Sequence, residues 1–176
     1  MNSDQELIQF INEGDTDAFE VLYQRYKDWV CRLAWRFTSN QQDTLDVLQE
    51  TFIYLLGKFP GFELTASMTT FLYPVVKNIS ITIRNKNRRF TSSEEILSEM
   101  TVPTSNETDS SRSELAAVLT VLPDEQREVL LMRFVDDMSL QEIADALDIP
   151  IGTVKSRLHH ALHKLRGDHR TKDYFL

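Results

Sequence analysis

Hydroxyl, imidazole and cationic side chains gather on one stretch near the end of the chain, from Ile151 to Arg166. A helix here, at about 100° per residue, would bury a single apolar stripe. That stripe consists of Val154, Leu158, Ala161 and Leu165. The other faces would carry Thr153, Lys155, Ser156, Arg157, His159, His160, His163 and Lys164. Such groups contact phosphates and base edges in the major groove of DNA, so the chemistry they suggest is recognition.

The segment before this stretch indicates a second short helix. Ser139 and Glu142 form a capping box at its start, and Ala144 is small enough to let another helix cross closely. Pro150 pushes the preceding residue out of the helical region and so ends it. Two short helices with a tight turn, the second one basic, are typical of a DNA-binding helix-turn-helix. The alternative is a helical hairpin with a solvated basic face.

The histidines also have the spacing of a metal site. His159 and His163 lie four residues apart, but no cysteine or carboxylate in that helix completes a ligand set. We therefore predict no metal and no cofactor. The one cysteine, Cys31, is expected to be a small buried hydrophobe, with a redox sensor as the alternative.

A second basic patch follows aromatic residues in the first half of the chain. The segment Thr69–Arg89 is predicted to be a helix that Pro74 interrupts or kinks. Its cations are Lys77, Arg84, Lys86, Arg88 and Arg89, and no acid accompanies them. Aromatic side chains beside cations suit unpaired bases, which stack on them. A core helix with a solvated basic end explains the same segment equally well.

The helix predicted over Asp43–Phe59 carries a local conflict. Its inward stripe is expected to be Leu48, Phe52, Leu55 and Phe59. The opposite side would present Asp46 and Glu50, which repel each other four residues apart, with Ile53 exposed beside them. A conflict of this kind suggests a surface for a partner. The alternative is a solvated acidic face.

Composition and patterning predict an all-α protein of two small helical domains. Of 176 residues, 41% are hydrophobic, which is enough for modest cores. We expect domains at 1–90 and 114–176, joined by a flexible acidic linker at 91–113 that is rich in Ser, Thr and Glu. The second domain would contain a helix after Pro123, with Val129, Leu130 and Phe134 facing inward.

Charge and hydropathy restrict where the protein acts. The net charge is −8, but the two basic patches allow local contacts with phosphates. No apolar run approaches the roughly 20 residues that span a bilayer, and the first residues do not form a cationic, apolar leader. We expect a cytoplasmic protein without membrane insertion.

The motifs, in this order, resemble the bacterial RNA polymerase sigma factors of the extracytoplasmic-function (ECF) group, in the sigma-70 family. The resemblance rests on DAFEVLYQRY, DVLQETFIYLLGKF, TFLYPVVKN with IRNKNRR, and LPDEQREVLLMRFVDDMSLQEIADALDIPIGTVKSRL. It covers nearly the whole chain outside the linker and the ends. It implies a factor that binds core RNA polymerase and directs transcription initiation at specific promoters, without catalysing a reaction itself.

The resemblance also implies roles for individual residues. Contacts to core polymerase, at the clamp helices of its largest subunit, fall on Asp46, Gln49, Glu50, Ile53 and Phe59. Contacts to the minus-ten promoter element fall on Phe71, Lys77, Asn78, Arg84, Lys86, Arg88 and Arg89, and on the loop before Thr69. Contacts to the minus-thirty-five element fall on Thr153, Lys155, Ser156, Arg157, His159, His160 and Lys164. Expected partners are the polymerase clamp and flap, promoter DNA and an anti-sigma factor.

Two other classes of function compete with this one. A stand-alone helix-turn-helix regulator would use the last domain alone, but it leaves the acidic face at Asp46 and the aromatic-basic helix at Thr69 unexplained. An enzyme such as a nuclease would need a paired-carboxylate metal site, a glycine-rich phosphate loop or a nucleophile with a histidine. The sequence offers none of these sets.

Overall fold

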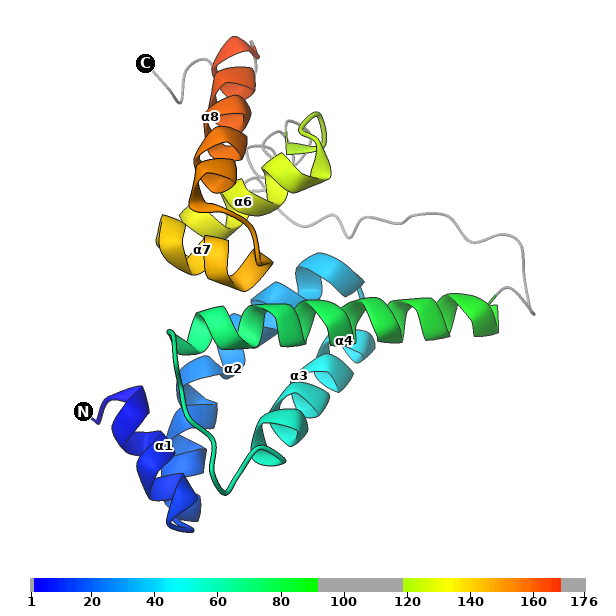
Figure 1. Ribbon diagram of the computed structural model, residues 1–176. Coiled ribbons are helices and arrows are strands. Elements are labelled where there is room, and N and C mark those ends of the chain that lie inside the picture. Colours follow the sequence, from blue (N-terminus) through cyan, green and yellow to red (C-terminus); the bar gives the residue numbers. More distant parts are fainter. Residues whose placement is uncertain (1, 92–118, 169–176) are drawn as a thin grey trace, which may run out of the picture. The chain divides into compact units, whose positions relative to one another are not determined.

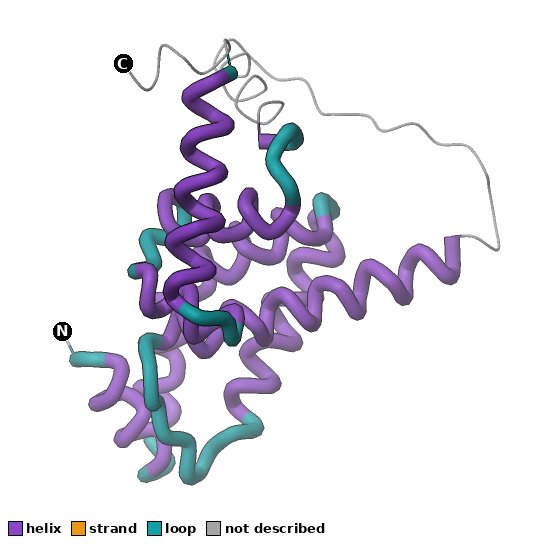
Figure 2. The backbone as a smooth tube through the Cα atoms, turned by 45° about the horizontal axis from the view of Figure 1, so that its top comes forward, coloured by secondary structure: helices purple, strands orange, loops and turns teal. Residues whose placement is uncertain are grey.

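The structure, a computed structural model, describes residues 2–91 and 119–168. Every regular element in these two ranges is a helix (Figures 1 and 2), so the predicted all-α fold is confirmed. The chain divides into two compact units, residues 1–96 and 97–176. The predicted linker at 91–113 lies, apart from its first residue, outside the described residues.

The first unit consists of α1 (Asp4–Asn12), α2 (Thr16–Thr38), α3 (Gln41–Leu56) and α4 (Met68–Thr91). Helices α2, α3 and α4 pack against one another, and α1 packs on α2 (Figure 1). Their shared core is aliphatic, and its fully buried members include Leu22, Val30, Leu33, Val47, Leu55, Leu72 and Val76. Side-chain caps mark the helix starts, because Ser3, Asp15 and Asn40 each accept a backbone N–H of the following turn.

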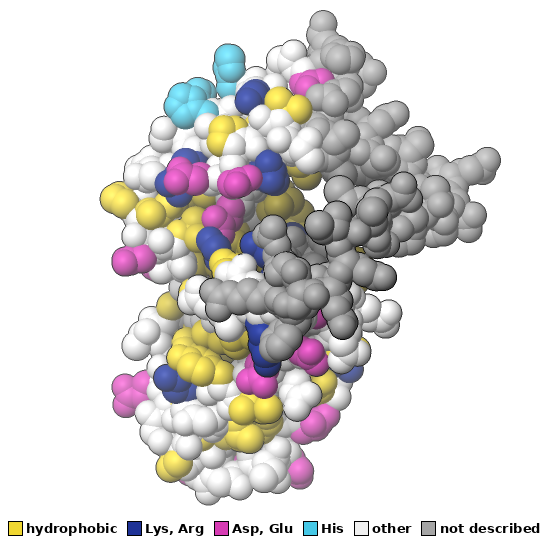
Figure 3. Space-filling model, turned by 90° about the vertical axis from the view of Figure 1, so that its right-hand side faces the viewer, with side chains coloured by type: hydrophobic (Ala, Val, Ile, Leu, Met, Phe, Trp, Pro, Cys, Tyr) yellow, Lys and Arg dark blue, Asp and Glu magenta, His cyan; other side chains and the backbone are white. Residues whose placement is uncertain are grey.

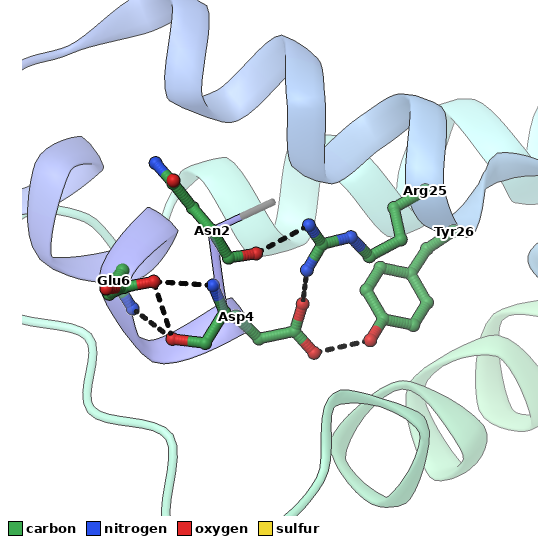
Figure 4. Close-up of polar contacts among 6 residues, drawn as sticks. Asn2, Asp4, Glu6, Arg25 and Tyr26 are labelled. Carbon is green, nitrogen blue, oxygen red and sulfur yellow. Dashed lines mark hydrogen bonds and ion pairs between the residues drawn. The ribbon is translucent and has the colours of Figure 1, made fainter.

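A polar cluster fastens α1 to α2 (Figure 4). The Asp4 carboxylate accepts hydrogen bonds from the Arg25 guanidinium and from the Tyr26 hydroxyl. Arg25 also donates to the backbone oxygen of Asn2 at 2.8 Å. Burial, and then the bond to Asp4, raise the pKa of Tyr26 well above its usual range. The first helix is therefore held by charge and hydrogen bonding as well as by its buried Leu7, Ile8 and Ile11.

Helix α3 differs from its prediction at one end and along its inner face. It ends at Leu56, and Gly57 caps it, so Phe59 lies beyond the helix. The buried stripe contains Val47 and Thr51 beside Phe52 and Leu55. Helix α4 continues through Pro74, so of the two expected effects of this proline an interruption of the helix is wrong. Pro74 removes one backbone donor, but the buried residues Tyr73 and Val76 on either side hold the helix in place.

The second unit consists of α6 (Asp124–Phe134), α7 (Leu140–Leu147) and α8 (Ile151–Gly167). Ser139 and Glu142 make the predicted capping box, and Asp148 ends α7 in the left-handed region at φ 53°. The expected inward position of Phe134 is wrong, because this side chain is 61% exposed. Val129 and Met132 take the inward positions of α6, and both are fully buried.

The predicted apolar stripe of α8 is confirmed. Val154, Ala161 and Leu165 are buried, and Leu158 packs against the same core as a partly buried residue. The helix therefore turns its remaining faces outward, as its sequence pattern indicates. Arg127 closes the other side of the unit by donating to the backbone oxygens of Leu119 and Leu122, each at 2.8 Å.

Candidate nucleic-acid interface

The outward face of α8 presents most of the side chains predicted to read DNA. Lys155, Ser156, His159 and His160 are exposed, and Thr153 is half-buried. The imidazoles project from the surface of this helix (Figure 3), with the ring centroids of His159 and His160 separated by 5.8 Å. A short row of donors on one exposed helix face has the form that fits a major groove.

Two of the predicted α8 contacts are already engaged within the unit. The Arg157 guanidinium pairs with the Glu125 carboxylate of α6 at 2.6 Å, and its side chain is only 24% exposed. The Lys164 ammonium donates to the backbone oxygen of Val121 at 2.8 Å. Both cations lie at the edge of the face rather than at its centre, so DNA would have to share them with these partners.

Along α4, the predicted contact residues differ in their exposure and in their hydrogen bonds. Asn78 and Lys86 are exposed, and Lys77 is half-buried. Arg84 donates to the backbone oxygen of Phe37 at 3.2 Å, which places its charge at the carboxyl end of α2, where cations are favoured. The side chains of Arg88 and Arg89 are outside the described residues.

At the other end of α4, Phe71 belongs to an aromatic cluster that the sequence did not reveal. Its ring lies 6.5 Å from that of Tyr54 in a stacked arrangement, with 22° between the planes, and 4.9 Å from the ring of Phe62. The Lys58 ammonium lies over the Tyr54 ring, 4.6 Å from its centroid. Tyr54 is 44% exposed. Aromatic rings beside a cation could stack an unpaired base and meet its phosphate.

Two open grooves flank the outward side of α3. One, between α2 and α3, has a volume of about 350 Å³ and is mainly apolar. Its lining is Phe19, Glu20, Tyr23, Leu45, Leu48, Gln49, Phe52, Ile53 and Leu56. The other, between α3 and α4, has a volume of about 480 Å³ and a more polar lining of Asp46, Gln49, Glu50, Asn78, Ile79, Thr82, Ile83 and Lys86.

These grooves regroup the predicted residues. Asp46 and Glu50, predicted for polymerase, share a groove with Asn78 and Lys86, predicted for DNA. Ile53 lines the apolar groove instead. Phe59 lines neither groove; its ring packs edge-on against Phe19 and Phe62. The structure thus brings four of the five predicted polymerase contacts onto the two sides of one helix.

The described residues contain no group of three His, Cys, Asp or Glu side chains arranged to hold a metal ion. Cys31 is half-buried, and burial raises the pKa of its thiol, which makes the thiolate less available. Among the described helices, none is long and apolar enough to cross a membrane.

Comparison with known proteins decides the family. Residues 22–90 match Sigma-70 region 2 and residues 118–167 match Sigma-70 region 4. The ECF RNA polymerase sigma factor SigW of Bacillus subtilis is 31% identical over 173 residues, which cover 90% of this chain and 92% of the relative. The chain belongs to the ECF RNA polymerase sigma factors. A sigma-E factor of Haemophilus influenzae is also 31% identical, over 90% of this chain and 91% of its own.

Solved structures agree with the fold of this sigma factor. CnrH, in complex with the cytosolic domain of CnrY, aligns with a TM-score of 0.69 at 20% identity, over 93% of this chain and 94% of that one. The sigma factor RpoE of Bartonella quintana, in complex with the anti-sigma factor NepR, aligns with a TM-score of 0.62 at 19% identity, over 84% and 94%. Both are likenesses of fold alone.

Membership settles the choice between classes of function. A sigma factor directs RNA polymerase to promoters, and this chain carries both of the sigma-70 regions that the family uses. The stand-alone helix-turn-helix regulator is therefore not favoured, because it would leave the region 2 match at residues 22–90 without a purpose.

Proposed function

We propose that this sigma factor binds core RNA polymerase through the outward side of α3 and holds a promoter at two places. The aromatic end and exposed face of α4 contact the minus-ten element, and the outer face of α8 contacts the minus-thirty-five element. It catalyses no reaction itself. The observation that carries the proposal is the exposed face of α3, whose composition is hard to explain without a partner.

Helix α3 exposes large aliphatic side chains that gain nothing from water. Leu45, Ile53 and Leu56 are 49%, 52% and 52% exposed, and all three line one groove. Glu50 has no ion-pair partner among the described residues, and Asp46 accepts only from the neutral Gln42 amide at 3.2 Å. Apolar area next to unpaired carboxylates supports binding of a protein surface that is both apolar and basic. The clamp helices of the polymerase are the proposed surface.

The minus-ten contacts are supported by the aromatic cluster and by the cations of α4. Phe71 and Tyr54 offer stacking faces, and Lys58 offers a charge next to them. Asn78 and Lys86 continue along the exposed side of the same helix. The predicted contacts Lys77, Arg84, Arg88 and Arg89 would meet phosphates. An unpaired strand could then lie with its bases on the rings and its backbone along the cations.

The minus-thirty-five contacts are supported by the free face of α8. Lys155, Ser156, His159 and His160 would reach base edges, with Thr153, Arg157 and Lys164 at the rim. This arrangement keeps readout of duplex DNA in the second unit and readout of opened DNA in the first.

The decisive experiment mixes the chain with bacterial core polymerase and a library of genomic fragments. We expect a stable complex and transcripts that begin at a shared pair of sequence elements. Binding to core without promoter-dependent transcripts would refute promoter recognition, and failure to bind core would refute the proposal as a whole.

Charge reversal then tests the proposed polymerase surface. Glu50→Lys should weaken core binding about tenfold, because it opposes the charge that the partner would meet. Asp28→Lys is the matched control, since Asp28 is an exposed acid on α2 that lines neither groove. Core binding is measured without DNA, because Glu50 shares a groove with Asn78 and Lys86. Equal loss in both variants would show a general charge effect instead of a site.

An anti-sigma protein is a further proposed partner. Its support is the Bartonella quintana neighbour, which was solved with the anti-sigma factor NepR. A protein that covers the exposed aliphatics of α3 would compete with polymerase for them. Competition between a candidate anti-sigma protein and core for this chain would support the proposal, and simultaneous binding of both would contradict it.

A further inference from the structure

The side chain of Asn12, the last residue of α1, binds a segment about fifty residues away. Its Oδ1 accepts from the backbone N–H of Gly61 at 2.6 Å and of Phe62 at 3.1 Å. Its Nδ2 donates to the backbone oxygen of Phe62 at 2.9 Å. Only one orientation of the amide satisfies all three bonds, because the oxygen faces two donors and the nitrogen faces an acceptor.

The segment that Asn12 binds is the loop at 57–67, between α3 and α4. Among the described residues, every hydrogen bond to the backbone of residues 60–66 comes from Asn12. Gly61 adopts a φ of +99°, a backbone conformation that residues other than glycine rarely adopt. The middle of the loop, residues 60–66, therefore has its described backbone hydrogen bonds with Asn12 alone, while the rings of Phe59 and Phe62 pack against each other.

The same contact reaches the start of α4 through one side chain. Phe62 is only 9% exposed, and its ring lies 5.4 Å from that of Phe59 and 4.9 Å from that of Phe71. Asn12 fixes the backbone of Phe62 on both sides, so it also fixes where that ring presses on Phe71. Helix α1 is itself anchored, since Asp4 bonds to Arg25 and Tyr26 of α2 (Figure 4).

We propose that Asn12 is a positioning residue for promoter opening. Its amide holds the loop at 57–67 in place. Through Phe62, it also positions the ring of Phe71, where an unpaired minus-ten base would bind. Without it the loop has several conformations, and the base must select one of them, which lowers affinity. This inference rests on the proposed function, because it requires that the first unit receives opened DNA.

The test uses holoenzyme, made from core polymerase and the full chain, on a promoter from the library experiment. The probe is a labelled single-stranded oligonucleotide with the non-template sequence of its minus-ten region. Asn12→Ala should weaken binding of this probe about tenfold, in line with the loss of two or three hydrogen bonds, and should slow promoter opening. Affinity for core should stay within about twofold, because Asn12 lines neither groove of α3.

Two further variants separate positioning from simple loss of stability. Asn12→Asp has the same shape and keeps the acceptor for Gly61 and Phe62, but it turns a carboxylate oxygen toward the Phe62 carbonyl. We expect an intermediate loss of probe affinity in a folded protein. Gln9→Ala, on the same helix, removes only a bond to the exposed Glu13 side chain and should bind the probe like the parent protein.

The outcomes are distinct. Parent holoenzyme that makes no promoter-specific transcripts overturns the proposed function. Parent holoenzyme that does so, with both Asn12 variants binding the probe at parental affinity, overturns only the role of Asn12. If Asn12→Ala does not fold, the Asn12→Asp result decides alone: reduced probe affinity with normal core affinity supports positioning, and parental affinity refutes it.

Discussion

Helix α8 presents its predicted DNA contacts from one face of a single helix, whereas the aromatic end of α4 takes its shape from three other segments. The ring of Phe71 packs against Phe62 of the loop and Tyr54 of α3, and Asn12 of α1 binds the loop. On α8, one helix positions the exposed side chains, so we expect a substitution there to act mainly at its own position. At α4, a change far along the chain can move the whole site.

Of the changes that test this difference, removal of the Phe62 ring should have the largest effect. We expect Phe62→Ala to lower the free energy of unfolding of the first unit by about 3 kcal/mol, because it leaves a cavity between Phe59 and Phe71. Urea unfolding followed by tryptophan fluorescence measures that unit alone, since both tryptophans, Trp29 and Trp35, lie in α2.

The control for this variant is the same substitution at an exposed site of the second unit. Phe134 is 61% exposed, so Phe134→Ala should leave the tryptophan transition unchanged. A Phe62→Ala protein with parental stability would show that the loop is not part of the structure that supports α4.

Sequence reasoning predicted α7 and α8 well because their signals are local. The capping box at Ser139 and the stop at Pro150 bound α7, and the spacing of Val154 and Leu165 marks the buried side of α8, all within one stretch of chain. Tyr54 and Asn12 were missed for the opposite reason, because their partners are distant in sequence and a periodic pattern cannot show them. The end of α3 was a missed signal rather than a hidden one, since Gly57 and Pro60 both mark a helix end.

The pairing of Arg157 with Glu125 is one of two places where another part of the second unit holds a predicted contact of α8, the other being the bond from Lys164 to Val121. Arg157→Ala should reduce the affinity of holoenzyme for duplex promoter about tenfold and leave core binding intact. Glu125→Gln should raise that affinity by about two- to threefold, because it removes an acid near the phosphates and releases the guanidinium. Filter binding or anisotropy at fixed salt measures both.

A different outcome would change the interpretation of this pair. If Glu125→Gln weakens promoter binding as much as Arg157→Ala does, the carboxylate orients the guanidinium and the two residues act as one unit. In that case α8 would resemble α4, because Arg157 would bind DNA only when Glu125 holds it in position.

The polar cluster of Asp4, Arg25 and Tyr26 predicts that the first unit loses stability at alkaline pH. The pKa of Tyr26 is raised in the folded state, so its hydroxyl stabilises the fold below the ordinary tyrosine pKa and that contribution is lost as the pH rises above about 10. Between pH 9 and 11, the parent protein should lose about 0.5 to 1 kcal/mol more than Tyr26→Phe, with allowance for solvent screening. Urea unfolding by tryptophan fluorescence measures the difference. Equal losses in the two proteins would show that the bond from Tyr26 to Asp4 is not the cause.

The smallest expected effect separates the two surfaces by pH. All four histidines of the chain lie at position 159 or beyond, so none is in the first unit. Because acid favours the charged form of histidine and phosphates attract that form, duplex promoter affinity should rise about two- to fourfold from pH 7.5 to 6. Binding of the single-stranded minus-ten probe, which we propose to involve α4, should not share this rise. His159→Gln with His160→Gln should abolish it, and a rise that persists in that variant, or that appears equally with the probe, would show that these two histidines are not its source.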